Sequence, residues 1–249
     1  MESKQVALVS GASRGIGAAI AKKFAQQGID LMLVARSEKE LRAVASTISR
    51  SYQVRVSHLS GDLKDEAICE RAIDKTIEEF GQVDILVNCA GTIHRAPTLE
   101  HQPYDWDEVM RTNVTSAFML SRLAISQMLQ QKQGGSIVNI SSQMAGIPHL
   151  GASPSYESSK AALDALTRHL AAEYADKNIR VNSVSPGSVE TALNKNMDPV
   201  RWKNIQEKIP MKRLGQPDEV AEAVNFLAST KASYITGNNI YVAGGSVMH

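Results

Sequence analysis

The stretch that decides the fold is Val6-Ala7-Leu8-Val9-Ser10-Gly11-Ala12-Ser13-Arg14-Gly15-Ile16-Gly17. Its four leading apolar residues form a short hydrophobic run, which is typical of a strand buried in a parallel sheet. Helical spacing follows over residues 15–27, and Gly28 is a candidate C-terminal cap. The glycines let the backbone turn tightly, and the first N–H groups of the helix can then bind a pyrophosphate. The stretch therefore predicts a strand, a phosphate-binding turn and a helix.

The same alternation of strand and helix continues along the chain. Further strands are expected at residues 31–34, 54–59, 83–87, 136–140, 179–184 and 239–242, with helices at 38–49, 65–80, 105–131, 155–175 and 217–228. This order predicts an α/β fold: a single doubly wound Rossmann-type domain over residues 1–249, with a mostly seven-stranded parallel sheet. Residues 188–213 break the rhythm, and we expect a substrate lid there, or else a structural excursion between two elements.

Composition narrows the class of protein. The chain has 27 basic and 26 acidic residues and a net charge of +1, so no basic excess favours a nucleic-acid partner. Its two cysteines, Cys69 and Cys89, do not have metal-ligand spacing, and we expect reduced thiols and no structural zinc. We see neither a signal-peptide region nor an apolar run near the ~20 residues of a membrane helix. A cytoplasmic location is therefore expected, without a membrane partner.

The end of the second expected strand indicates the cofactor. An NAD site needs a carboxylate there to bind the ribose hydroxyls, but this strand ends in Arg36 and Ser37, with no acid until Glu38. Arg36 could pair with a 2′-phosphate, and Ser37 could donate a hydrogen bond to it. Arg14, within the glycine turn, adds a second cation. These residues favour NADP(H), and the alternative is that both arginines are merely solvated.

Tyr156 and Lys160 are candidates for acid–base chemistry. They lie four residues apart near the start of an expected helix, and therefore on the same helix face. A free tyrosine has a pKa near ~10 and is a poor base at neutral pH. We expect the lysine ammonium to lower the pKa of Tyr156, so that the pair can exchange a proton beside a carbonyl carbon.

Taken together, these motifs give the chain its resemblance to a known family. It resembles the short-chain dehydrogenase/reductase family over essentially all 249 residues. The motifs that carry the resemblance are Gly11-x3-Gly15-Ile16-Gly17, Asp62, Asn88-Cys89-Ala90-Gly91, Asn113, Ile140-Ser141-Ser142, Tyr156-x3-Lys160 and Pro186-Gly187-Ser188-Val189-Glu190-Thr191.

The resemblance implies a catalytic group of Asn113, Ser142, Tyr156 and Lys160. Tyr156 would exchange a proton with the substrate oxygen, and Ser142 would hydrogen-bond that oxygen. Lys160 would tune Tyr156 and bind the nicotinamide ribose, while Asn113 would hold a water in a proton relay that reaches Lys160. The implied cofactor-binding residues are Gly11, Ser13, Arg14, Gly15, Ile16, Gly17, Arg36, Ser37, Asp62, Leu63, Asn88, Ala90, Gly91, Tyr156, Lys160, Pro186, Gly187, Val189 and Thr191.

Within that set, the resemblance also implies which part of the cofactor some residues contact. Asp62 would contact the adenine. Asn88, Ala90 and Gly91 would line the cofactor cleft, and Val189 and Thr191 would bind the carboxamide. No metal is implied.

Three features depart from the family pattern. Cys89 replaces the usual second asparagine, and Ala243 replaces the usual aspartate before the C-terminal Gly-Gly. Ser142 precedes Tyr156 by fourteen residues, where thirteen is commoner, so Ser141 is a rival for the catalytic serine. We favour Ser142 because it ends the run Ser-Ile-Val-Asn-Ile-Ser-Ser as the family's serine does.

The substrate is the least determined part. The run Thr92-Ile93-His94-Arg95-Ala96-Pro97 is similar to a loop of sugar-acid dehydrogenases such as gluconate 5-dehydrogenases, and Arg95 could bind a substrate carboxylate, together with the contacts from Ser142 and Tyr156. Alternatively, Arg95 is a surface residue away from the substrate. A second possibility is a 3-oxoacyl-acyl-carrier-protein reductase, whose carrier would need a basic patch. Candidates for that patch are Arg95, Arg201, Lys203, Lys212 and Arg213.

Other functions and the oligomeric state can also be considered from the sequence. A broad carbonyl reductase fits the same motifs, whereas epimerases and dehydratases of the extended family add a substrate domain. A cofactor-binding sensor without catalysis is disfavoured by the intact catalytic group. The resemblance implies a homotetramer, or a homodimer, packed through residues 105–131 and 155–175. An apolar face of Ala161, Leu163, Leu166 and Leu170 suits such an interface or a monomer's core.

Overall fold

All seven strands pair in parallel in one sheet of order β3-β2-β1-β4-β5-β6-β7 in the computed structural model, which describes residues 4–131, 133–147, 153–191 and 199–248. The strands are β1 (Val6–Ser10), β2 (Asp30–Ala35), β3 (Val56–Ser60), β4 (Ile85–Asn88), β5 (Gly135–Ile140), β6 (Ile179–Pro186) and β7 (Asn239–Val242). The strand order reverses between β1 and β4, and ligands of open parallel sheets bind at such a reversal. The predicted single seven-stranded α/β domain is confirmed.

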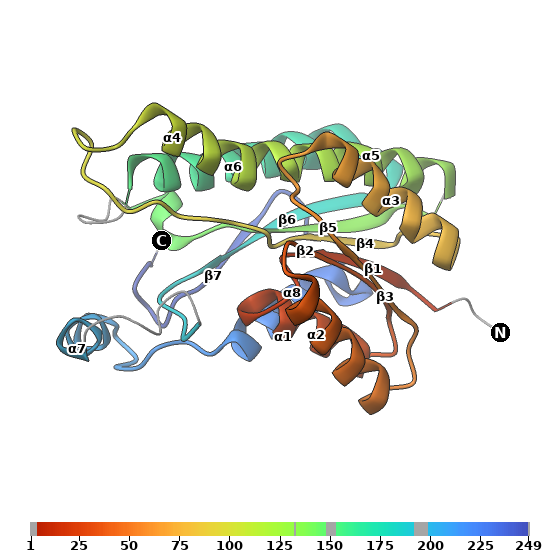
Figure 1. Cartoon of the computed structure of the whole chain (residues 1–249), viewed down its shortest axis with the longest axis horizontal. Helices are drawn as coiled ribbons and strands as arrows, with labels where there is room; N and C mark the ends of the chain where they lie inside the picture. The colour runs from red at the N-terminus through yellow and green to blue at the C-terminus, as the bar shows by residue number, and fades with distance from the viewer. Residues whose placement is uncertain (1–3, 132, 148–152, 192–198, 249) are drawn as a thin grey trace.

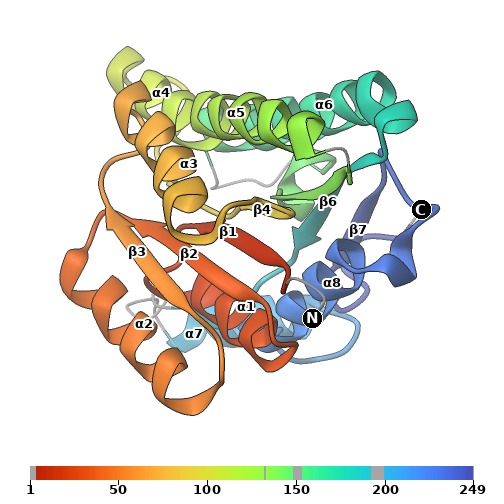
Figure 2. The same cartoon turned by 90° about the vertical axis from the view of Figure 1, so that its right-hand side faces the viewer.

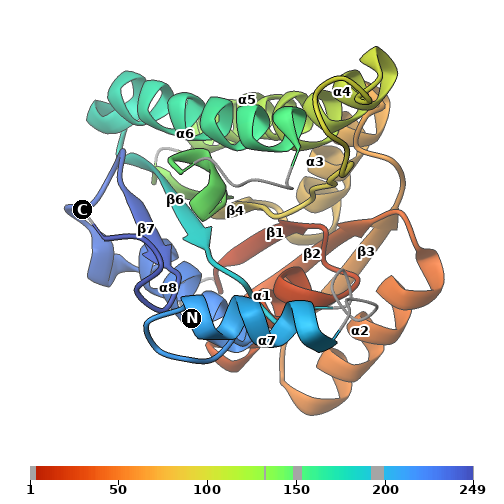
Figure 3. The ribbon, with the colours of Figure 1, turned by 90° about the vertical axis from the view of Figure 1, so that its left-hand side faces the viewer.

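Helices cover both faces of the sheet (Figures 1 and 2). One layer contains α1 (Gly15–Gln26), α2 (Glu38–Ser51) and α8 (Pro217–Ala228), and α7 (Pro199–Lys208) lies on the same side (Figure 3). The other layer contains α3 (Glu66–Phe80), α4 (Pro103–Met110), α5 (Ser116–Gln131) and α6 (Pro154–Tyr174). Each layer packs its apolar side chains onto one face of the sheet, so the core is divided in two by the strands.

Several boundaries differ from the sequence prediction by one or two residues. Three differences have a visible cause: a side chain replaces a regular backbone partner, or the helix geometry changes. β3 begins at Val56, since the Arg55 N–H donates to the Asp30 carboxylate at 2.8 Å. β4 begins at Ile85, and the Val83 N–H donates to Gln131 Oε1 at 2.9 Å. The helix expected over residues 105–131 is interrupted by a π-helical turn, Arg111–Thr115, between α4 and α5.

A chain of buried polar side chains ties the middle of the sheet to the layer of α5 and α6. The Asn88 side chain donates to Ser121 Oγ at 3.0 Å and to Asn139 Oδ1 at 2.8 Å. Asn139 in turn donates to Thr167 Oγ1 at 2.8 Å, and Ser183 Oγ donates to the same oxygen at 2.9 Å. Buried polar groups without partners are costly, so these bonds favour one register of α6 on the sheet.

The apolar face expected on α6 is only partly available to another subunit. Leu163 and Leu170 are buried in the core of the protomer, so they cannot contact a neighbour. Ala161 is exposed and Leu166 is half-buried. The helical spacing indicated an apolar stripe correctly, but the sheet beneath α6 covers half of it.

Among the residues that the structure describes, none of the helices is both long and apolar enough to cross a membrane. Within the same ranges, no group of His, Cys, Asp and Glu side chains is placed to hold a metal ion.

The glycine turn permits no side chain at Gly17. A Cβ atom there would collide with the carbonyl oxygen of Gly11. We therefore predict that Gly17→Ala lowers the free energy of unfolding by about 1–3 kcal/mol, because the backbone of the turn must shift. Chemical denaturation would measure the change. Gly215→Ala is the matched control, since its new Cβ would meet Val189 Cγ2 at an ordinary 3.5 Å. Equal stability of the two variants would contradict this account of the turn.

Candidate active site

The glycine turn after β1 is packed against the end of β4. Gly11 has a φ of +67°, and a Cβ there would lie 2.8 Å from the Ala90 nitrogen. Ser10 Oγ accepts hydrogen bonds from the backbone N–H groups of Cys89 and Ala90 at 3.0 and 3.1 Å. Only a residue without a side chain fits between these backbones, so Gly11 lets the turn pack directly against the end of β4.

The N-terminus of α1 is suited to an anion. Arg14, at the N-cap, has extended backbone and makes no side-chain capping bond, and the first turn from Gly15 contains no acidic residue. Its N–H groups and the helix dipole therefore favour negative charge. Gly15 faces the Thr191 side chain, which a Cβ would meet at 3.6 Å. The turn therefore fits a dinucleotide pyrophosphate held between residues 11–17 and the segment that contains Thr191.

The end of β2 presents positive charge. Arg36 is exposed there, as Arg14 is at the start of α1, and Ser37 Oγ accepts the Glu40 N–H as the N-cap of α2. Glu38, the nearest acid along the chain, has its carboxylate engaged elsewhere. The Ser60 side chain has the largest effect in lowering the pKa of Glu38, followed by His58, whose Nε2 lies 3.3 Å from Glu38 Oε1. Arg42, which donates to the same oxygen at 3.1 Å, lowers this pKa further.

The other expected cofactor residues follow β3 and β4. Leu63 is buried, and Asp62 Oδ1 accepts the Lys64 N–H at 3.1 Å. Ala90 and Gly91 lie at the end of β4, and Gly91 faces both Asn113 Oδ1 and Lys160 Nζ. The Asn88 side chain, in contrast, lies within the buried polar chain beneath the sheet edge. The Asn88 amide is therefore engaged inside the protein, with Ser121 and Asn139.

Asn113 lies in the π-helical turn and braces the loop after β4. Its Oδ1 accepts the Thr92 N–H at 2.8 Å, and its Nδ2 donates to the Thr92 carbonyl at 3.0 Å and to Ser159 Oγ at 2.9 Å. Single π-helical turns inside α-helices are frequent at functional sites. The role of Asn113 in holding a relay water remains a prediction. Its side chain already makes three hydrogen bonds within the protein.

Ser142, Tyr156 and Lys160 meet where β5 ends and α6 begins. Lys160 Nζ donates to the Ile140 carbonyl at 2.7 Å and lies 5.7 Å from the centre of the Tyr156 ring. Burial raises the pKa of the Tyr156 phenol, and the neighbouring Ser142 side chain acts to lower it. Its neighbour Ser141 turns the other way and donates to the Lys160 carbonyl at 3.3 Å. Of the two rival serines, Ser142 is therefore the one beside Tyr156.

Burial dominates the electrostatics of this group. It lowers the pKa of Lys160 to about 8 and raises the pKa of Tyr156, although Ser142 and the charge of Arg95 act to lower the latter. The expectation that Lys160 would bring the pKa of Tyr156 below its ordinary value is not met, because removing the phenolate from water outweighs the favourable contacts. Burial also raises the pKa of the Cys89 thiol to about 12, so this thiol is neutral.

The loop after β4 presents Arg95 near Tyr156. Arg95 is exposed, and its charge acts on the Tyr156 phenol. The loop is held just before Arg95, since Thr92 is bonded to Asn113 and His94 Nε2 lies 3.3 Å from the buried carboxylate of Asp105. These anchors fix the backbone while leaving the guanidinium free to meet a ligand.

The segment after β6 closes the opposite side of the site. Gly187 donates its N–H to the Val242 carbonyl, and a Cβ on Gly187 would lie 2.8 Å from the Ala243 Cα. Pro186, the last residue of β6, is buried, and Val189 is buried where it bridges Gly215. Of the expected lid, residues 192–198 lie outside the described residues, and 199–208 form α7.

Comparison with known proteins decides the family. Residues 11–247 match the family model described as enoyl-(acyl carrier protein) reductase. The chain is 37% identical to the 3-oxoacyl-acyl-carrier-protein reductase of Aquifex aeolicus over 97% of this chain and 96% of the relative. It is 36% identical to the 2-dehydro-3-deoxy-D-gluconate 5-dehydrogenase of Dickeya dadantii over 97% and 94%.

Solved structures agree. A short-chain type dehydrogenase/reductase from Mycobacterium marinum superposes with a TM-score of 0.94 at 32% identity, covering 99% of this chain and 97% of that one. An actinorhodin polyketide ketoreductase with NADPH superposes with a TM-score of 0.93 at 30% identity, covering 99% and 98%. The chain belongs to the short-chain dehydrogenase/reductase family. It is therefore an oxidoreductase with the fold that this family uses.

Two side chains of this short-chain dehydrogenase/reductase contribute to the site without having been singled out from the sequence. Ser10 joins the glycine turn to β4, and Ser159 holds Asn113. The available signals were weak: Ser10 directly precedes Gly11, and Ser159 directly precedes Lys160. Serine next to a motif is common, so only the spatial contact distinguishes these two.

Burial of Lys160 should weaken the fold at neutral pH. Its pKa falls from 10.5 to about 8, so between these values the unfolded chain binds more protons and stability from this group rises with pH. The cost is therefore fully present below pH 8. We predict that Lys160→Met raises the free energy of unfolding at neutral pH by roughly 1–3 kcal/mol, and that the gain shrinks as pH rises through this window.

Urea denaturation at neutral and alkaline pH would measure both effects. Lys231→Met is the control, because Lys231 is exposed and its replacement should change stability by less than about 0.5 kcal/mol. A Lys160→Met protein less stable than the wild type at neutral pH would show that the Lys160 hydrogen bond outweighs the burial cost.

Proposed function

We propose that this protein is an NADP(H)-dependent oxidoreductase that interconverts a ketone and a secondary alcohol. The observation that carries the proposal is the meeting of Ser142, Tyr156 and Lys160 at the carboxyl end of β5. This point lies beside Gly91 and the glycine turn, where a dinucleotide would be held. A proton donor, a hydrogen-bond donor and a cation thus surround one position above the sheet edge.

Each of these side chains has a separate task. The hydride would come from bound NADPH and go to the carbonyl carbon. Burial keeps Tyr156 protonated, so its hydroxyl can donate a proton to the carbonyl oxygen as negative charge develops there. Ser142 Oγ would donate a second hydrogen bond to that oxygen. Lys160, held by the Ile140 carbonyl, stabilises the phenolate that remains and supplies the proton that restores it.

Charge at the end of β2 supports NADP(H) over NAD(H). Arg14 and Arg36 are exposed near the N-terminus of α1, and the Glu38 carboxylate is bound to His58 and Arg42. A 2′-phosphate would therefore meet cations, whereas ribose hydroxyls would find no free acid close to Arg36 along the chain.

We predict that the wild type uses NADPH in preference to NADH, and that Arg36→Ala lowers kcat/KM with NADPH by about 10- to 100-fold, because one charge-assisted contact is lost. The value with NADH should change by less than about twofold, since NADH has no 2′-phosphate. Arg50→Ala, at the far end of α2, serves as the control. A wild-type preference for NADH would refute this assignment of Arg36.

The position of Arg95 supports an anionic substrate. Its exposed guanidinium acts on Tyr156, so a carboxylate bound to it would place a nearby keto group at the Tyr156 hydroxyl. We propose a keto sugar acid as the substrate. The similar protein from Dickeya dadantii is named for the oxidation of a deoxygluconate, which is a substrate of this chemical class.

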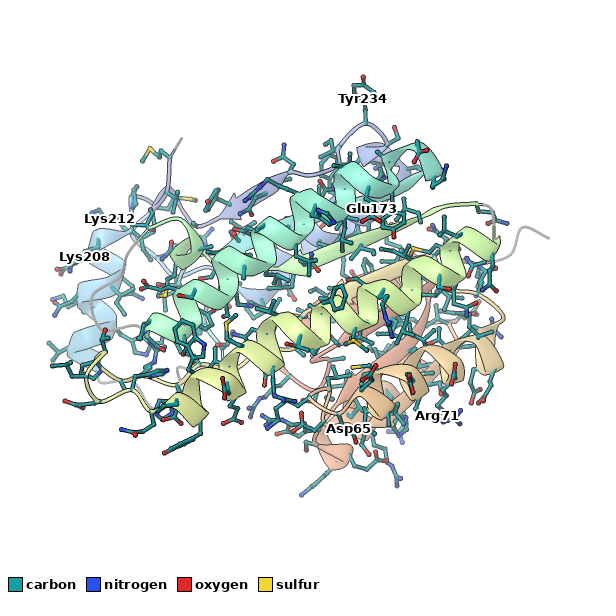
Figure 4. The ribbon with its side chains drawn as sticks, turned by 90° about the horizontal axis from the view of Figure 1, so that it is seen from above. Asp65, Arg71, Glu173, Lys208, Lys212 and Tyr234 are labelled. Atoms are coloured by element: carbon teal, nitrogen blue, oxygen red, sulfur yellow. The ribbon has the colours of Figure 1, made fainter. Side chains whose placement is uncertain are left out.

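A second candidate is the reduction of a 3-oxoacyl thioester on a carrier protein, as the relative from Aquifex aeolicus is named for. A carrier protein needs exposed basic side chains beside the site. Lys203 is exposed, but Lys212 donates to the Glu207 carbonyl at 2.7 Å and Arg213 pairs with Glu219 at 2.6 Å. Lys212 and Lys208 lie at the α7 end of the molecule (Figure 4), and the side chain of Arg201 lies outside the described residues.

A substrate panel with NADPH tests these proposals. We predict turnover of 5-ketogluconate above that of an acetoacetyl thioester. Arg95→Ala should raise KM for the keto acid by about 10-fold or more, with little effect on a neutral ketone of similar size, because only the acid loses an ion pair. Tyr156→Phe should remove turnover of every ketone. Higher turnover of the thioester would favour the second candidate. NADPH binding without turnover of any substrate would refute the proposed oxidoreductase activity.

We also propose assembly into a homotetramer or homodimer through α5 and α6, which lie side by side along one face (Figure 4). Phe118 and Leu129 on α5 are large apolar side chains that are 44% and 41% exposed. A contact between subunits would remove them from water.

A further inference from the structure

A third ionisable side chain continues the line of Tyr156 and Lys160 along α6. Asp164 follows Lys160 by one helical turn and lies on the same face of the helix. It is only 9% exposed. Aspartate is seldom buried without a specific partner, and the proposed reaction does not use this one.

One hydrogen bond joins Asp164 to the sheet. Asn239 Nδ2, at the start of β7, donates to Asp164 Oδ2 at 3.0 Å. Among the described residues, no hydrogen-bond partner reaches the other carboxyl oxygen, the buried Oδ1. Burial raises the pKa of this carboxyl, and the side chains of Ser141, after β5, and Ser183, on β6, act to lower it. Ser141 in addition donates to the Lys160 carbonyl and directly precedes Ser142. Asp164 therefore belongs to the same helix as the proposed catalytic lysine, and that helix is bonded to the segment that carries the proposed catalytic serine.

The charged groups around this line come from several elements. Lys160 and Arg168 flank Asp164 on α6, and Tyr241 approaches it from β7. Lys160 in turn faces Asp164, Tyr156 and the Cys89 thiol at the end of β4. Burial raises the pKa of Asp164, whereas the two serines and the two neighbouring cations lower it. Reciprocally, the charge of Asp164 raises the pKa of Lys160, against the larger effect of burial.

We propose that Asp164 is a positioning residue for the reaction: it ties α6 to the start of β7 and supplies the negative charge that keeps buried Lys160 protonated beside Tyr156. This inference rests on the proposed function, because it assigns a task to Asp164 within the same proton transfer. A merely structural role predicts something different, namely that loss of the Asp164 carboxyl affects stability alone.

The sign of the effect does not depend on which member of the pair titrates first. Removal of a nearby negative charge makes the loss of a proton easier for both Lys160 and Tyr156. The alkaline limb of the pH profile for ketone reduction must then move to lower pH. For unit charges one helical turn apart, we expect a shift of roughly half a pH unit or more.

The test compares Asp164→Asn, which keeps the shape but removes the charge, with Asp164→Glu, which keeps the charge. The Asn variant should shift the alkaline limb of kcat/KM downward, and the Glu variant should restore most of the wild-type limb. Asn239→Ser is the matched control, since it removes the hydrogen bond but leaves the charge, and should lower the melting temperature without moving the limb. Asp164→Ser removes the charge in the same way if the Asn variant does not fold.

A second readout does not require turnover. The phenolate absorbance of Tyr156, taken as the difference between each protein and its Tyr156→Phe counterpart, should titrate at lower pH in Asp164→Asn than in the wild type. If no ketone is reduced by the wild type, the proposed function fails while this titration still decides the task of Asp164. An unchanged titration in Asp164→Asn, with only a lower melting temperature, would overturn the proposal and leave Asp164 as a structural residue.

Discussion

The hydrogen bond from Lys160 Nζ to the Ile140 carbonyl joins the two elements on which the site depends. It fastens α6 to the carboxyl end of β5, and thereby sets Tyr156 beside Ser142. A lysine amine in this position has left water almost completely, and its altered pKa reflects the free energy that burial costs. The fold can tolerate that cost because both neighbouring elements are firmly packed in the core.

That packing is itself partly polar. The buried chain from Asn88 through Asn139 to Thr167 runs beneath the site and fixes α6 against three adjacent strands. An apolar interface of the same area would allow the helix to slide by small amounts at little cost, whereas each displaced amide here would lose a partner inside the protein. Precise placement of Tyr156 and Lys160 therefore depends on side chains that never reach the cleft.

The expected cofactor cleft and the substrate loop are held by a different principle, which is close backbone contact. Gly11 and Gly17 allow the turn to fold onto itself and onto Ala90, and the N-terminus of α1 then faces the segment that contains Thr191. Asn113 clamps Thr92 through its amide, and the loop therefore presents Arg95 from a fixed base. Rigid backbone with a free cationic side chain is an arrangement that selects an anionic group by position.

By itself, the sequence determined the doubly wound sheet, the glycine turn and the pairing of Tyr156 with Lys160. Each of these depends on local periodicity or on the spacing of residues that are close together in the sequence. It favoured Ser142 over Ser141 only through the family resemblance, because two adjacent serines at a strand end differ physically only in the side to which each points, and packing against α6 decides that. Nor could it set the pKa of Tyr156, since helical spacing brings the lysine near but says nothing of the water that burial removes. The tertiary structure also placed Asp164, Ser183 and Asn239 together, because β7 pairs with β6 in the register that sets Asn239 opposite Ser183, within reach of α6.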